Sequence, residues 1–168
     1  GVKENDFAMI LGFPGRTNKF YTSWEVAERR DIDNSVRIKI RDIRQKVMLE
    51  EMMRDPQVRI QYASKYASST NAHKNAIGSN WAINKRNFEK VKLDVQDKLT
   101  AWSKQNNKPE YIEAMQALKQ IVTDRKDLRF RSWMLDEALI RGIEFTGIPT
   151  EVDPIIDALK KKDQKAIK

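Results

Sequence analysis

The sequence contains no cysteine and only one histidine, and it is poor in glycine and proline. Without cysteine, neither a disulfide nor a thiolate metal site can form. The low numbers of glycine (6) and proline (5) favour long helices over an all-β or disordered chain. No apolar run approaches the roughly 20 residues of a membrane-spanning helix. No charged segment followed by an apolar one marks a signal peptide at the start.

Catalytic and metal-binding patterns are also missing. The single histidine, His73, has no acidic residue three or four positions away, so we interpret it as a core or surface histidine. Asp31 and Asp33 are interpreted as helix caps rather than ligands. Gly12–Gly15 lacks the residues of a phosphate-binding glycine loop. We therefore expect no catalytic residue, no metal and no cofactor, and we predict that the chain alone is inactive.

What the chain does have is charge. One third of its residues are charged, the formal net charge is +8 and the pI is about 9.6. A basic balance is compatible with nucleic-acid binding, but no recognised reading motif is present, so we do not expect it. We interpret the stripe of Arg37, Arg41 and Arg44 as a solvated helix flank. A stand-alone basic helical module that binds a nucleic acid or a protein remains the alternative.

The first element predicted is a β-strand. Phe7–Leu11 is a short apolar run, and Pro14-Gly15 is typical of a type II turn. Everything after this run is helical in pattern, so the rest of its sheet is missing. Because the chain also starts without methionine, we expect it to be a piece of a longer protein. We expect the strand to be disordered, to pack on the helices, or to pair with a second copy and so form a homodimer.

Helix signals fill the remainder of the chain. Asp55-Pro56 combines an N-cap with a proline at the first helical position. The other expected boundaries are a cap at Thr22 or Ser23, a cap at Asn34 or Ser35, an interruption at Gly78, a helix over 81–102, a loop at 106–109, a helix over 111–122, a helix over 127–143 and a cap at Thr150. The four tryptophans are interpreted as core residues at helical spacing: Trp24, Trp81, Trp102 and Trp133. The predicted fold class is mainly α, with antiparallel helices and one stray N-terminal strand.

The segment Tyr62–Asn80 has an unusual face. At about 100° per residue, one side is the ordinary packing stripe, with Tyr62, Tyr66, Thr70, His73 and Ile77. The other side is small, polar and uncharged, with Ser64, Ser68, Asn71, Asn75 and Gly78. Such residues are poor choices for an exposed helix surface, which suggests a binding site. A tight contact with another helix is the alternative.

Three blocks of the sequence resemble the bacterial dipeptidyl peptidase 7 and 11 serine exopeptidases. The spacing between the blocks matches as well, and the resemblance covers at least the first half of the chain. The blocks are Asp6–Asn18 (DFAMILGFPGRTN), Thr22–Trp24 (TSW) and Ala63–Ser69 (ASKYASS), the last followed by Asn71, Lys74-Asn75 and Ile77-Gly78.

The resemblance implies that a chymotrypsin-like double β-barrel carries the catalytic triad outside this chain. Residues 1–21 would be the last strand and exit turn of the first barrel. Residues 22–168 would be part of a helical cap that closes the cleft over the N-terminus of an oligopeptide. The family also implies a periplasmic, cell-surface or secreted location.

The resemblance further implies substrate-binding residues. The family uses an asparagine of the cap to hold the substrate's terminal amine. Asn75 and Asn71 are the candidates, since both lie in the matching block and on the small polar face; we prefer Asn75.

Overall fold

A computed structural model describes residues 3–7, 9 and 18–161, and these residues form a mainly α-helical fold with no strand. The mainly α prediction is confirmed. The predicted strand Phe7–Leu11 and its turn fall largely on residues 8 and 10–17, which lie outside the described residues. Phe7 and Met9, the described residues of that run, are exposed.

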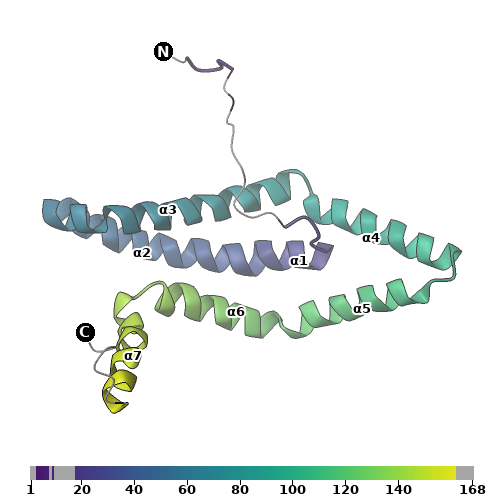
Figure 1. The fold of residues 1–168 in the computed structure, drawn as a ribbon. Helices are drawn as coiled ribbons and strands as arrows, with labels where there is room; N and C mark the ends of the chain where they lie inside the picture. The colour runs from purple at the N-terminus through teal and green to yellow at the C-terminus, as the bar shows by residue number, and fades with distance from the viewer. Residues whose placement is uncertain (1–2, 8, 10–17, 162–168) are drawn as a thin grey trace.

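The helices form three layers, of which one outer layer runs opposite to the central layer and the other runs in the same direction as it (Figure 1). The central layer is a continuous rod of α1 (Ser23–Glu28), the π-helical η1 (Arg29–Asn34) and α2 (Ser35–Arg54). On one side of it lie α3 (Pro56–Lys85) and α4 (Phe88–Gln105). On the other side lie α5 (Pro109–Asp124), α6 (Lys126–Leu135) and the π-helical η2 (Asp136–Ile140). The 3₁₀ turn η3 (Glu144–Gly147) leads into α7 (Ile148–Lys160), which extends away from the layers at one end.

Several predicted boundaries are confirmed. Thr22 caps α1 through a capping box, in which its hydroxyl accepts from the backbone N–H of Glu25 and the Glu25 carboxylate accepts from the backbone N–H of Thr22. The Asp55 carboxylate accepts from the backbone N–H of Gln57 at 2.7 Å, and Pro56 opens α3. The loop before Pro109 also forms, with Asn107 in the left-handed region at φ 51°.

Other predicted boundaries are wrong. Asn34 and Ser35 do not cap a helix, because the chain passes through them helically and Asn34 is buried. Gly78 does not interrupt α3, which continues to Lys85 and so includes Trp81. Thr150 lies inside α7, which begins at Ile148.

The interior of the described residues is more polar than apolar. Six apolar residues are buried, against nine polar or charged ones. The tryptophans are not the core that their spacing suggested: Trp24 and Trp133 are half-buried, whereas Trp81 and Trp102 are 65% and 45% exposed. Trp81 follows Asn80, which faces inward, and is therefore rotated by about 100° off the packing stripe. Polar contacts rather than aromatic packing hold the layers together.

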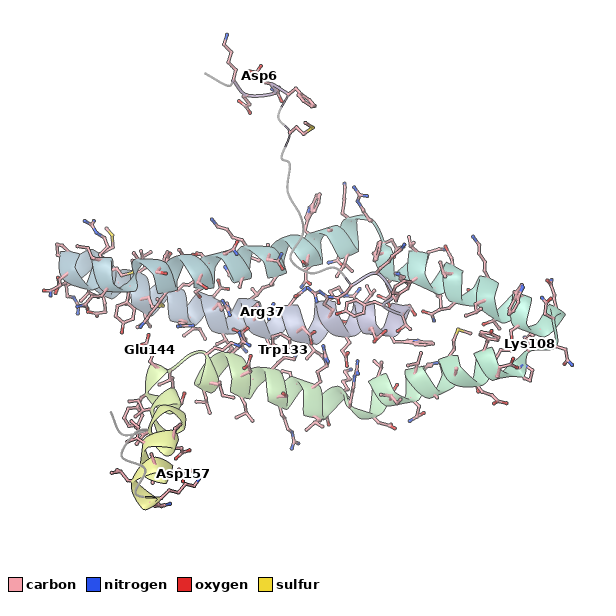
Figure 2. The ribbon with its side chains drawn as sticks, viewed as in Figure 1. Asp6, Arg37, Lys108, Trp133, Glu144 and Asp157 are labelled. Carbon is pink, nitrogen blue, oxygen red and sulfur yellow. The ribbon has the colours of Figure 1, made fainter. Side chains whose placement is uncertain are left out.

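The carboxylate of Glu137 is the most buried of these contacts, with 1% of its side chain exposed. Its oxygens accept from Arg41 Nε at 2.8 Å and from Arg37 Nε at 2.9 Å, which ties η2 to α2. The Arg37 guanidinium also lies 4.6 Å from the centre of the Trp133 ring on α6, and Figure 2 labels both residues. Burial alone would raise the pKa of Glu137, but the hydrogen bonds and charges of Arg41 and Arg37 outweigh it and lower that pKa. The interpretation of Arg37 and Arg41 as a solvated flank is therefore wrong.

A second ionic cluster joins the start of the rod to α6. The Glu28 carboxylate accepts from Arg125 at 2.6 and 3.0 Å, and Asp33 accepts from Arg129 at 2.6 and 2.8 Å. Both carboxylates are buried, and the pKa values of the two arginines are raised by these hydrogen bonds. Asp33 is thus an interior ion-pair partner rather than a cap. Asp31, also predicted as a cap, lies within η1 and pairs with its neighbour Arg30 at 2.7 Å.

We expect Glu137→Gln to lower the free energy of unfolding of this chain by about 3 kcal/mol, because it leaves two arginines facing a neutral group in a buried site. Since the folded-state pKa of Glu137 is lowered, its contribution is fully present above the unfolded value of about 4.3 and is lost as the pH falls through the folded-state value. The difference between the two proteins should therefore be constant near neutral pH and should shrink below about pH 4. Urea unfolding across pH measures it.

The exposed Glu51 provides the matched control. It pairs with Arg54 on the surface of α2 at 2.8 Å, so Glu51→Gln should change the stability by less than about 0.5 kcal/mol. Equal effects of the two substitutions would show that the Glu137 cluster does not hold the layers together.

Candidate functional site

The orientation of α3 is fixed by residues that point toward α2. Ser69 is buried, and its backbone carbonyl accepts from Arg41 Nη1 at 3.2 Å while its hydroxyl accepts from Gln45 Nε2 at 3.2 Å. The same Arg41 binds Glu137, so one side chain links α2, α3 and η2. A second anchor lies farther along the helix, where Asn80 Oδ1 accepts from Asn34 Nδ2 at 2.7 Å. These contacts determine which side of α3 faces away.

The small polar face of α3 is the outward one. Asn71 follows Ser69 by two residues, which places it about 200° around the helix and therefore on the opposite side. Asn71 and Asn75 are exposed, as are the other members of this face, Ser64, Ser68 and Gly78. Within the part of the chain that the structure describes, no hydrogen bond engages either amide, and no helix covers the face. The alternative of a tight helix–helix contact is not met inside these residues.

This geometry suits recognition of a peptide. Asn71 and Asn75 are one turn apart, about 6 Å along the axis, and each amide can donate to a carbonyl or accept from an ammonium group. Gly78 adds no bulk, so another backbone can approach the helix closely. An amide in contact with water binds an ammonium only weakly, because water competes for the same hydrogen bonds. Strong binding of an ammonium at this face would therefore need a second surface that covers the amides and excludes water.

The single histidine lies between α2 and α3. His73 is half-buried, and its Nε2 is 2.9 Å from Oδ1 of Asp42 on α2. This pair could not be predicted from the sequence because the two residues are far apart along the chain. Within residues 3–7, 9 and 18–161, no group of three histidine, aspartate or glutamate side chains is placed to hold a metal ion. No helix among them combines the length and hydropathy needed to cross a membrane.

Comparison with known proteins gives one consistent answer. The sequence profile of the family described as Peptidase S46 matches residues 1–167. The Asp/Glu-specific dipeptidyl-peptidase of Porphyromonas gingivalis is 49% identical over the whole of this chain, and the chain covers 23% of that protein. The dipeptidyl-peptidase 7 of Phocaeicola vulgatus is 38% identical over 99% of the chain, which again covers 23% of it. The chain thus spans about a quarter of the length of these relatives.

Solved structures agree. The crystal structure of Porphyromonas endodontalis DPP11 in complex with the dipeptide Arg-Glu matches with a TM-score of 0.77 and 40% identity, over 93% of this chain and 23% of that one. The structure of the same protein in complex with substrate matches with a TM-score of 0.73 and 41% identity, over 99% of this chain and 25% of that one.

We expect Gly78→Ala to raise the stability of this chain by about 0.5–1 kcal/mol, since a glycine inside a helix costs about that much relative to alanine. A Cβ at Gly78 would meet nothing within 4 Å. The matched control is Gly142→Ala, which should destabilise the chain because its Cβ would overlap the backbone carbonyl oxygen of Ala138. Thermal unfolding of both variants tests this; a loss of stability in Gly78→Ala would show that glycine is structurally required there.

Proposed function

This chain belongs to the Peptidase S46 family, and we propose that it forms the non-catalytic helical cap of a serine dipeptidyl peptidase. In the complete protein, an activated serine would attack the second peptide bond of an oligopeptide and release a dipeptide through an acyl-enzyme. The catalytic groups would come from the parts of the protein beyond this chain. Residues 22–168 would be the cap, and residues 1–21 would belong to the first barrel.

The face carrying Asn71 and Asn75 is the observation that supports this proposal. Asn75, with Asn71 beside it, would hold the free amino terminus of the substrate, Asn75 Oδ1 accepting a hydrogen bond from the ammonium. Holding that end at a fixed distance from the serine explains how such an enzyme measures out two residues. The second wall that the exposed amides require would come from the catalytic domain.

The exposed apolar surface is consistent with a cap that packs on other parts of a larger protein. Many large apolar side chains are exposed, among them Ile60 at 78%, Leu128 at 70% and Ile140 at 68%. Surfaces of this kind mark contacts with further protein.

We propose that the complete enzyme lies in the periplasm or outside the cell, as expected for the family. Homodimer formation is also part of this proposal.

The alternative of a basic helical binding module loses the feature that favoured it. Arg37 and Arg41, two members of the best basic stripe, are bound to Glu137 in the interior. Salt-dependent retention on heparin or DNA would still support that alternative.

We expect Asn75→Ala in the complete enzyme to lower kcat/KM for dipeptide release by a factor of about ten to several hundred, the cost of one charge-assisted hydrogen bond. Competitive inhibition by a free dipeptide should weaken by a similar factor, whereas inhibition by the N-acetylated dipeptide should not change. Steady-state kinetics with both inhibitors measure this.

Asn84→Ala is the matched control, because Asn84 is an exposed asparagine of the same helix, rotated by about 140° from the Asn71 position. It should leave both kcat/KM and the inhibition by the free dipeptide unchanged. Unaltered kinetics in the Asn75 variant, or an equal loss with Asn84→Ala, would refute the assignment.

A further inference from the structure

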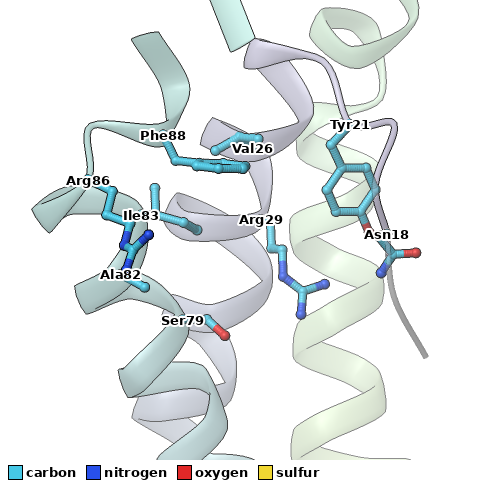
Figure 3. Close-up of a pocket in the computed structure, with 9 residues that line it drawn as sticks. All are labelled: Asn18, Tyr21, Val26, Arg29, Ser79, Ala82, Ile83, Arg86 and Phe88. Carbon is cyan, nitrogen blue, oxygen red and sulfur yellow. The ribbon is translucent and has the colours of Figure 1, made fainter. Parts of the chain in front are cut away.

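A cavity of about 360 Å³ lies between the start of the central rod and the last turns of α3 (Figure 3). Arg29, the first residue of η1, and Arg86, the C-cap residue of α3, both line it. Its neutral polar groups are Asn18, Tyr21 and Ser79, and Phe88 closes an apolar side. The volume falls within the range of small-molecule pockets, about 300–1,000 Å³.

The charge of this cavity is not balanced. No aspartate or glutamate lines it. Arg41 and Arg125, by contrast, are held within 3 Å by the carboxylates of Glu137 and Glu28. The ion pairs formed by the described residues include neither Arg29 nor Arg86. The two guanidinium groups and the neutral donors beside them are suited to bind a carboxylate, and the apolar wall is suited to pack against the short aliphatic chain that carries it.

The cavity continues the face that carries Asn75. Ser79 lies one turn beyond Asn75, about 6 Å along the axis, and Arg86 lies about 16 Å along it. Both are within about 40° of Asn75 around the helix. An extended peptide advances about 3.3–3.6 Å per residue, so a chain whose amino end is at Asn75 would reach the cavity with its third to fifth residues.

We propose that this cavity binds the side-chain carboxylate of an acidic residue at the third to fifth position of the peptide substrate. The inference rests on the proposed function, because it takes Asn75 as the site of the amino terminus. Arg29 and Arg86 are substrate-binding residues in this account. They would select among peptides by the residues that follow the released dipeptide.

The test uses the complete enzyme and hexapeptides that share their first two residues and carry either glutamate or glutamine at position 3, 4 or 5. We expect kcat/KM to be about three- to tenfold higher for the glutamate peptide at one of these positions. Arg86→Gln should reduce this preference, and Arg29→Gln with Arg86→Gln should abolish it. Because Arg86 is exposed, its single variant is expected to fold even where the double variant does not.

Lys85→Gln is the matched control, because it removes an exposed positive charge beside Arg86 that does not line the cavity. It should keep the glutamate preference. Each of these results would overturn the inference: no preference at any of the three positions, a preference that Arg86→Gln leaves undiminished, or an equal loss in Lys85→Gln. Inorganic phosphate could instead inhibit hydrolysis of the glutamine peptides, with an inhibition that disappears in Arg86→Gln. That result would assign the cavity to a free anion and would also overturn the inference.

The Asn75→Ala variant separates this inference from the proposed function. It should lower kcat/KM for glutamate and glutamine peptides by the same factor. A normal Asn75→Ala enzyme that still prefers glutamate would remove the amino-terminal assignment and leave the arginine cavity. A defective Asn75→Ala enzyme without any glutamate preference would keep the amino-terminal assignment and remove the assignment of the arginine cavity.

Discussion

The hydrogen-bonded contact of the Glu137 carboxylate with Arg41 and Arg37 is the interaction on which the rest of the structure depends. A buried carboxylate is costly, and its pKa stays low here only because two guanidinium groups hold it. Arg41 also binds the backbone carbonyl of Ser69, so the same side chain joins all three layers at their centre. With few apolar side chains fully buried, this polar contact determines how α2, α3 and η2 are oriented relative to one another. Hydrogen bonds are directional, and they set that orientation more strictly than apolar packing would.

The orientation of α3 follows from these contacts. Ser69 and Asn80 are fixed toward the central rod, and the helical repeat then places Asn71 and Asn75 outward. A surface helix usually carries long charged residues, whereas this one carries serine, asparagine and glycine at some cost in helix propensity. That cost is understandable if a peptide lies along the face. The exposed amides and the paired interior arginines thus belong to one arrangement, in which ion pairs join the helices inside and neutral amides remain exposed on the outward face of α3.

Local signals in the sequence predicted the helical class, the Thr22 cap, the Asp55-Pro56 start and the polar face of α3, because each depends on residues close together in the chain. The mistakes share one cause. Asn34, Asp33 and Arg41 have side chains suited to caps or solvated surfaces, and only partners about 30 to 100 positions away make them interior residues. The π-helical segments η1 and η2, which direct these groups, leave no simple periodic pattern. The interruption predicted at Gly78 is wrong because that prediction rests on the tendency of glycine to end helices. Here the absence of a side chain leaves the outward face open instead.

The most direct test of the central claim is a crystal structure of the complete protein with a dipeptide bound. We predict that Asn75 Oδ1 lies about 2.7–3.2 Å from the terminal nitrogen of the dipeptide, with the Ser69 and Glu137 contacts to Arg41 intact. A structure in which Asn71 and Asn75 are covered by another helix, or in which the terminal nitrogen binds elsewhere, would contradict the account.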